Sequence, residues 1–428
     1  MSDHRPLNVV VVNEGLGYPA TAGNWIRTLN LMLRLAKRHR ITYICRAVDD
    51  RAAVKRAADF YADQGIRAII VDDPVGRKSG ARFYGSLAAN LLSNLPYAIA
   101  SHNSTAVRRA IAAYAAENPV DLWQFECLGY TDALRHLPDA RTLVMAHNIE
   151  SQIWRRIHLN ESAPLKRWYF HQQWRKFELF ERRVFSAATR VVAVSEQDAV
   201  AARERYGARR IDIVDNGVDR ALYGEINGQR RLGQILYLGT LDWLPNLDAV
   251  EQLLRIFPCV RERELTAHLC IVGRNPPQSL IRRLGTMPNA SLHADVPDVR
   301  PYLAQSAVMA VPLRIGGGSR LKIIEAMAAG LPVVSTMIGC EGLRLVPGRD
   351  ITVVENVDQM ADALVHAVKN PATMRAAADR ARRLVLERYD WDVLADRLER
   401  IWRQTIAEPA AAPAADSSPS AEASPAQP

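Results

Sequence analysis

The sequence predicts an α/β protein with two domains, each built around a parallel β-sheet. Short apolar runs rich in β-branched residues alternate with helical patterns along the chain, and such continuous runs are typical of strands that helices cover on both faces. The runs form two sets with a glycine-rich break between them. A length of 428 residues also exceeds what one hydrophobic core usually accommodates and suits two domains.

Each of the two sets contains six predicted strands. They lie at residues 8–12, 42–45, 68–71, 122–125, 143–146 and 191–194, and then at residues 235–238, 269–272, 291–294, 308–311, 333–335 and 352–354. Because helical patterns separate consecutive strands, parallel pairing through crossover helices is expected. The expected architecture is two Rossmann-like domains, at residues 1–222 and 223–385.

The connection between the domains is expected between Gly217 and Leu232, where glycines interrupt the pattern. Residues 386–407 are expected to form a terminal helix that packs back toward the first domain, because the stretch from Trp391 to Thr405 is amphipathic. Residues 408–428 are almost entirely Ala, Pro, Ser and Glu, so they are predicted to be disordered.

Composition indicates a globular, cytosolic protein. Hydrophobic residues make up 48% and charged residues 24%, and no apolar run approaches the roughly 20 residues that span a bilayer. The first residues lack the basic-then-apolar pattern of a signal peptide. Five scattered cysteines without metal-ligand spacing indicate reduced core residues rather than disulfides or a metal site.

The net charge of +9 favours an acidic partner. Nucleotide diphosphates, anionic lipid headgroups and nucleic acid all qualify. Nucleic acid is the least favoured, because the arginines are spread over many helices and form no single block.

The most informative segment is residues 311–336, which predicts a strand, a glycine loop, a helix, a tight turn and a second strand. The loop that opens the helix consists of Gly316, Gly317, Gly318 and Ser319. Unpaired backbone N–H groups at a helix start form an anion site. Arg320 and Lys322 add positive charge, and Glu325 on the second turn offers a carboxylate to sugar hydroxyls. A diphosphate with an attached ribose fits these features together.

The same segment resembles the nucleotide-sugar-binding half of GT-B glycosyltransferases, most of all those of family 4. That family carries an acidic residue, seven intervening positions and a second acidic residue within a segment ending Glu-Ala-Met-Ala-x-Gly-x-Pro-Val-Val. Residues 325–334 match this ending, but Gly317 replaces the first acidic residue. The family places that residue near the donor sugar, so the resemblance leaves open how this chain holds the sugar hydroxyls.

Two strand ends in the second domain are further candidates for donor binding. Gly239 follows the strand at 235–238, and the family often places an Arg and a Lys just after this turn to hold the diphosphate. This chain has Asp242, Trp243 and Asn246 there, so the positive role is assigned to Arg320 and Lys322. Gly273 and Arg274 end the next strand, where the family's nucleotide base lies. Pairing of Lys322 with Glu325 at i, i+3 and a merely solvated Arg274 are the structural alternatives.

In the first domain, Gly17 and Gly23 flank the first strand-to-helix turn and are expected to face the cleft. His147 ends the strand at 143–146, where the resemblance implies a histidine that contacts the transferred sugar. A neutral imidazole can hydrogen-bond a hydroxyl or carry a proton near neutral pH. Glu126 ends the preceding strand and is a candidate acceptor-site carboxylate.

A basic aromatic stretch occupies residues 154–185. One interpretation is an interfacial helix that meets a lipid-linked acceptor. The favoured alternative is a long helix packed on the first domain with its arginines in solvent.

The resemblance implies a retaining glycosyltransferase that moves a sugar from a nucleotide-diphosphate donor to a glycan or lipid-linked acceptor, in bacterial surface polysaccharide synthesis. His147, Arg320 and Lys322 would be its catalytic residues, with no cofactor and no essential metal. A nucleotide-sugar epimerase, a phosphorylase and a non-catalytic carbohydrate-binding scaffold remain the alternatives. Peripheral contact with an anionic membrane at its inner, cytoplasmic face is a further expectation, and nucleic acid is not an expected partner.

Overall fold

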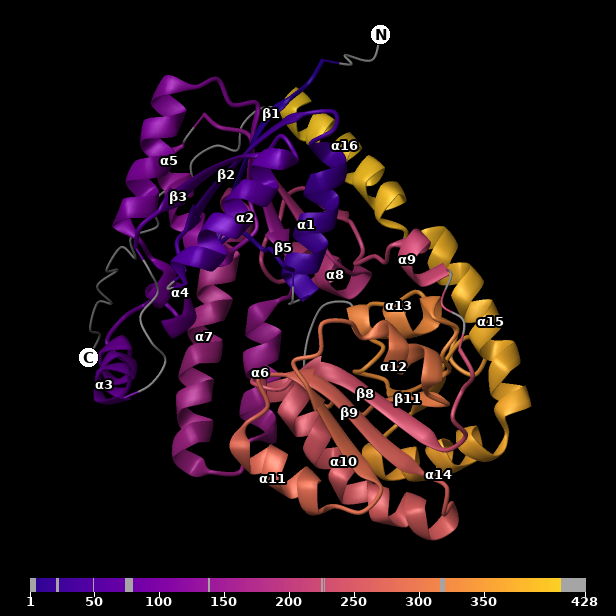
Figure 1. The fold of residues 1–428 in the computed structure, drawn as a ribbon. Coiled ribbons are helices and arrows are strands. Elements are labelled where there is room, and N and C mark those ends of the chain that lie inside the picture. The colour runs from indigo at the N-terminus through magenta and orange to yellow at the C-terminus, as the bar shows by residue number, and fades with distance from the viewer. Residues whose placement is uncertain are drawn as a thin grey trace, which may run out of the picture.

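The computed structural model describes residues 5–20, 23–48, 50–73, 80–137, 139–224, 226, 228–315 and 320–408. These residues form two parallel sheets with flanking helices (Figure 1). The predicted loop residues Gly316, Gly317, Gly318 and Ser319 lie outside the described residues, as does the predicted tail beyond Glu408.

The first sheet has seven parallel strands in the order β3-β2-β1-β4-β5-β6-β7. Their bounds are β1 (Asn8–Asn13), β2 (Arg40–Arg46), β3 (Arg67–Val71), β4 (Leu122–Phe125), β5 (Thr142–Ala146), β6 (Arg190–Ala193) and β7 (Ile211–Ile213). All six predicted strands of this half are present. The edge strand β7 was not predicted, because three residues with a central aspartate form no apolar run.

Helices cover both faces of this sheet. They are α1 (Gly23–Leu35), α2 (Arg51–Asp63), α3 (Gly80–Asn90), α4 (Tyr97–His102), α5 (Thr105–Glu117), the 3-10 helix η1 (Leu128–His136), α6 (Glu150–Asn160), α7 (Pro164–Ala187) and α8 (Glu196–Glu204). Alternate residues of β1 reach opposite faces: Val9 and Val11 belong to one apolar cluster, Val10 and Val12 to another. A strand buried on both faces reads as a continuous apolar run, which is the pattern seen in the sequence.

The second sheet has six parallel strands in the order β10-β9-β8-β11-β12-β13. The strands are β8 (Gln234–Thr240), β9 (His268–Arg274), β10 (Ala290–Ala294), β11 (Val308–Val311), β12 (Val333–Thr336) and β13 (Thr352–Val354). The helices of this half are α9 (Arg220–Gly224), α10 (Leu244–Arg263), α11 (Gln278–Thr286), α12 (Arg300–Gln305), α13 (Leu321–Ala328), α14 (Val357–Lys369), α15 (Pro371–Arg388) and α16 (Trp391–Ala407). The predicted strands all occur here, and the fold class predicted from sequence is confirmed.

The C-terminal helix α16 runs back along the first sheet beside α1 (Figure 1). Its buried residues recur at helical spacing and join the apolar cluster of β1 and α1. They are Trp391, Leu394, Ala395, Leu398, Ile401, Trp402 and Thr405. This helix therefore completes one face of the first sheet, although it follows the second sheet in sequence.

The chain passes between the two halves twice, near Val218 and near Tyr389, and these two segments are in contact. The backbone N–H of Val218 donates to the carbonyl of Tyr389 at 2.7 Å. A Cβ atom at Gly217 would lie 2.7 Å from that same carbonyl oxygen and 2.7 Å from the Trp391 ring, so the close approach requires glycine. The domain boundaries near residues 222 and 385 stay a prediction, and these contacts mark where the two halves join.

Candidate active site

Both sheets reverse their strand order at one point, which is where α/β proteins bind ligands beyond the carboxyl ends of strands. In the first sheet the reversal lies between β1 and β4, and in the second between β8 and β11. Glu126 directly follows β4 and His147 directly follows β5. Gly239 lies at the end of β8. Glu126 and Gly239 thus lie at the two switch points, and His147 lies one strand away from the first of them.

His147 and Glu126 form a direct pair. Nε2 of His147 lies 2.8 Å from Oε2 of Glu126, which also accepts a hydrogen bond from the Thr28 hydroxyl at 2.7 Å. The second oxygen, Oε1, accepts a hydrogen bond from the Gln124 amide. Burial by itself would raise the pKa of Glu126, but the hydrogen bond and charge of His147, the Thr28 hydrogen bond and the Arg27 charge bring that pKa below its ordinary value. Glu126 is therefore an anion that orients the imidazole.

This geometry corrects the expected role of Glu126. The sequence suggested an acceptor-site carboxylate, but the side chain is 5% exposed and both of its oxygens are bonded to protein side chains. A carboxylate enclosed in this way has no surface to offer an acceptor hydroxyl. Its place at the strand end was correctly predicted, but burial depends on the packing of α1 and α16, which strand patterns do not reveal.

Arg27 is a buried residue of this region that sequence reasoning missed. Its side chain has no exposed surface and donates to the carbonyl of Asp215 at 2.5 Å. Burial lowers its pKa to about 10, against the charges of Glu126 and Asp215, so it remains a cation near neutral pH. The sequence did hold a signal for this role: Arg27 lies one turn into a helix whose other buried residues include Leu29, Met32 and Leu35.

Lys322 brings positive charge to the turn after β8. Its ammonium donates to Asn246 Oδ1 at 2.9 Å and to the Tyr237 hydroxyl at 3.3 Å, and lies 4.6 Å from the centre of the Tyr237 ring. The amide NH2 of Asn246 donates to the Thr240 carbonyl at 2.9 Å, which turns the amide oxygen toward the lysine. The family's usual basic residues are absent from this turn, and Lys322 reaches it from α13 instead.

Burial sets the charge state of this group. Desolvation, followed by the Arg320 charge, lowers the pKa of Lys322 to about 7 against the opposing charge of Glu325. Burial raises the pKa of Glu325 to about 7, with the Tyr223 hydrogen bond and the Lys322 charge opposing the rise. The Tyr223 hydroxyl, from α9, donates to Glu325 Oε1 at 2.7 Å. Because the pKa of Lys322 is about 7, a bound anion readily favours the protonated, positively charged form of this side chain.

The described residues that flank the glycine loop both contact the first half of the chain. Ile315, before the loop, packs with Ile153 and Ile157 of α6. Leu321, after the loop, packs against the cluster of β1 and α1, as does Leu16. Because α6 begins three residues after His147, the contact with Ile153 and Ile157 brings Ile315 to the side of the first sheet that carries His147.

The hydrogen-bond partners of Arg320 differ from those of Lys322. It is 8% exposed, and its Nη2 donates to the carbonyl of Ile338 at 3.3 Å. Burial lowers its pKa to about 10, and its charged neighbours are Glu341, Arg156 and Asp198. Arg156 of α6 in turn forms a two-pronged ion pair with Glu341 at 2.7 and 2.8 Å. Arg320 therefore takes part in the contact between the two halves, and its expected role beside the diphosphate stays a prediction.

The predicted glycines serve different purposes. A Cβ atom at Gly273 would lie 2.3 Å from the Gly239 carbonyl oxygen, and one at Gly239 would lie 3.0 Å from the Asn246 side chain. Gly273 thus lets the end of β9 approach the end of β8, and Gly239 lets β8 approach the first turn of α10. Arg274 ends β9, where its carbonyl accepts from Leu241 at 2.7 Å. Gly17 lies against Trp25, at 3.1 Å from a built Cβ, and Gly23 begins α1 with open space around it.

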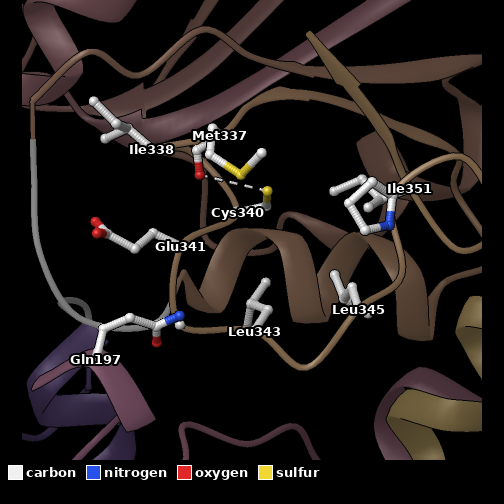
Figure 2. Close-up of a pocket in the computed structure, with 10 residues that line it drawn as sticks. Gln197, Met337, Ile338, Cys340, Glu341, Leu343, Leu345 and Ile351 are labelled. Carbon is white, nitrogen blue, oxygen red and sulfur yellow. Dashed lines mark hydrogen bonds between the residues drawn. The ribbon is translucent and has the colours of Figure 1, made fainter. Parts of the chain in front are cut away.

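A cavity of about 330 Å³ borders the neighbours of Arg320, because Ile338 and Glu341 line it. Figure 2 shows Met337, Ile338, Leu343, Leu345 and Ile351 of the second half around it, with Gln197 of α8 at its edge. Among the described residues that line it, none belongs to the predicted site. In the same part of the chain, no three His, Cys, Asp or Glu side chains gather into a metal-binding group.

Comparison with known proteins places the chain in a family. The model described as Glycosyltransferase Family 4 matches residues 23–222, and the model described as Glycosyl transferases group 1 matches residues 233–370. The chain belongs to the family 4, group 1 glycosyltransferases. Together the two models cover most of both halves, including His147, Lys322 and Glu325.

Its relatives in the family include two mannosyltransferases. The MMP α-(1→4)-mannosyltransferase of Mycolicibacterium hassiacum is 26% identical over 252 residues, which are 56% of this chain and 60% of that protein. The GDP-mannose-dependent monoacylated α-(1-6)-phosphatidylinositol monomannoside mannosyltransferase of Corynebacterium glutamicum is 25% identical over 162 residues, 35% of this chain and 42% of that protein. The matches thus span about half the length of these relatives.

Solved structures show the same fold. The sucrose-phosphate synthase of Thermosynechococcus elongatus superposes with a TM-score of 0.69 at 17% identity and covers 94% of this chain and 99% of that one. At this identity the likeness shows the fold alone, which is the GT-B arrangement of two Rossmann-like domains expected from the sequence.

Proposed function

We propose that this protein is a retaining glycosyltransferase that transfers a mannosyl group from GDP-mannose to a lipid-linked or glycan acceptor in the synthesis of a bacterial surface polysaccharide. The observation that carries the proposal is the Lys322 ammonium, held by Asn246 and Tyr237 at the switch point of the second sheet. The relatives named as mannosyltransferases, one of them GDP-mannose-dependent, select the donor to test first.

In the proposed reaction, the bond between the sugar C1 and the diphosphate oxygen breaks while a bond from C1 to an acceptor oxygen forms. The diphosphate leaves with added negative charge, and Lys322 stabilises that charge. Glu325 accepts a hydrogen bond from the ribose, and His147 contacts a hydroxyl of the sugar being transferred. The acceptor hydroxyl gives its proton to an oxygen of the departing diphosphate as the new bond forms, and no metal ion is needed for this arrangement.

A donor screen tests the proposal. The purified chain is expected to bind GDP-mannose and to transfer mannose to phosphatidylinositol-mannoside vesicles, with thermal stabilisation that rises with donor concentration. UDP-glucose and GDP-glucose serve as the comparison donors. A preference for UDP-glucose would contradict the choice of base and sugar. Donor turnover into a free epimer, without transfer, would favour the epimerase alternative.

Membrane contact forms part of the proposal, and the connection between α6 and α7 is its expected site. Within the described residues, no helix is long and apolar enough to cross a bilayer. The stretch predicted as one long helix is a hairpin of two, and large apolar side chains near its connection are exposed: Leu159 by 57%, Leu165 by 78% and Trp168 by 48%. Lys166 and Arg167 are exposed beside them. Apolar and basic side chains together suit an anionic membrane surface.

Vesicle sedimentation checks this contact. The chain is expected to bind anionic vesicles, to ignore neutral ones and to detach as salt increases. Leu165→Glu is expected to lower binding severalfold, because it removes apolar area and adds repulsion. Leu265→Glu changes a leucine of the second half that is 76% exposed and serves as the matched control. An equal loss of vesicle binding in both variants would contradict a role for the α6–α7 hairpin.

A further inference from the structure

The end of β4 is connected to the C-terminal helix by an unbroken line of hydrogen bonds. The indole N–H of Trp402 donates to Gln124 Oε1 at 2.6 Å, and the Gln124 amide NH2 donates to Glu126 Oε1. Glu126 Oε2 contacts Nε2 of His147 at 2.8 Å. Trp402 and Gln124 have no exposed surface, so water does not compete for these bonds.

The donor and acceptor of each hydrogen bond in this line follow from the indole of Trp402, where the line begins. A tryptophan N–H can only donate, so the atom of Gln124 that faces Trp402 is the amide oxygen. The NH2 of Gln124 then faces Glu126, which as a carboxylate can only accept. The third bond at Glu126 therefore takes a hydrogen from His147, so Nε2 of the imidazole carries a hydrogen. In the neutral form of the ring, the lone pair is then on Nδ1.

We infer that Trp402 and Gln124 are positioning residues, through which the C-terminal helix holds Glu126 in place and sets which nitrogen of His147 carries the proton. The inference deepens the proposed function and rests on it for the role of His147. A lone pair on Nδ1 lets the imidazole accept a hydrogen bond or a proton from a hydroxyl at that atom. The helix α16 follows the second half of the chain in sequence. It thereby contributes to the site of the first half, at the ends of β4 and β5.

The first test needs no substrate. In the Glu126→Gln variant, Trp402 still holds the Gln124 oxygen, so the Gln124 NH2 still faces residue 126. The new amide must turn its oxygen toward Gln124 and its NH2 toward His147. That arrangement requires the lone pair on Nε2 and moves the imidazole proton to Nδ1. Nitrogen-15 spectra of histidine-labelled protein distinguish the two tautomers, and a His147→Gln sample assigns the signal.

The double variant Glu126→Gln with Trp402→Phe isolates the contribution of Trp402. Phenylalanine cannot donate to Gln124, so the Gln124 amide is free to turn its oxygen toward residue 126. The Nε2–H form is then expected to return in part. Retention of the Nε2–H tautomer in Glu126→Gln alone, or no difference between the single and double variants, would overturn the inference.

Kinetics supply the second readout, with a matched control on the same helix. Trp402→Phe is expected to lower kcat by about tenfold and to leave the donor KM within about twofold, because a misplaced imidazole acts on turnover rather than on nucleotide binding. Trp391→Phe makes the same change at another buried tryptophan of α16, and its kcat is expected to stay near that of the parent. Equal kcat values for the two variants would show that loss of packing alone explains the effect. The nitrogen measurements decide the inference even if no transfer activity is found.

Discussion

Replacing His147 by alanine is expected to lower turnover by about a hundredfold or more, the range of one positioned proton-transfer or charge-stabilising group. The imidazole stands at the end of β5 and is held by Glu126 at 2.8 Å. A contact with the transferred sugar that strengthens as the bond breaks affects kcat more than donor affinity. Steady-state kinetics together with calorimetry of nucleotide binding measure the two effects separately.

The matched control for this prediction is His102→Ala. His102 also lies in the first half and pairs with a carboxylate, Glu14, at 3.3 Å, but it is not bonded to Glu126. Its replacement is expected to leave turnover within a few-fold of the parent. Near-normal turnover in His147→Ala would remove the imidazole from the chemistry. A parallel loss of nucleotide affinity would indicate instead that His147 supports the second half structurally.

Replacing Lys322 by methionine is expected to weaken binding of GDP-mannose by roughly 10- to 100-fold, or about 1.5–3 kcal/mol, the contribution of a hydrogen bond to a charged group. Methionine keeps the length and apolar stem of the side chain and removes the ammonium. The buried site then holds one charge fewer, so the folded state is not expected to suffer. Calorimetry on the folded variant measures the change, and unchanged affinity would exclude Lys322 from the diphosphate site.

The pH dependence of donor binding identifies the same group. The pKa of Lys322 is about 7 in the free protein, so the side chain is cationic below that pH and neutral above it. Affinity for GDP-mannose, whose diphosphate does not titrate in this range, is expected to fall as pH rises through 7, by up to about tenfold per unit. Lys322→Arg keeps its charge throughout and is expected to flatten the profile. Any dependence left in that variant belongs to Glu325, whose pKa is also about 7.

Short-range sequence patterns were sufficient to predict most strands. The two features that were not predicted, β7 and the break between α6 and α7, also have explanations in the local sequence. Central strands such as β1, β4 and β5 were recognisable because a parallel strand buried on both faces is a continuous apolar run. The strand β7 (Ile211–Ile213) was not predicted because its central aspartate interrupts the apolar run. The break between α6 and α7 escaped because residues 154–185 keep one composition across it, although Pro164 begins the second helix there.

The candidate site also has a part that the sequence predicted and a part that only the structure shows. His147, Lys322 and Glu325 were identified from strand ends and from the motif at residues 325–334, both of which are short-range features. The distinction between Arg320 and Lys322, two residues apart, was not visible, because it depends on which half of the molecule each side chain meets. Lys322 meets Asn246, whereas Arg320 has Asp198 and Glu341 as charged neighbours.

The sequence by itself determined the fold class, the two sets of strands and the chemical types at the strand ends, because hydrophobic periodicity and motif spacing are local properties of a chain. Only the tertiary structure decided what those groups do. Trp402 and Gln124 are 278 positions apart. Glu126 changes from a candidate ligand contact to a positioning anion once Thr28, Gln124 and His147 enclose it. Hydrogen-bond direction and desolvation set charge and tautomer, and both arise only when distant segments pack together.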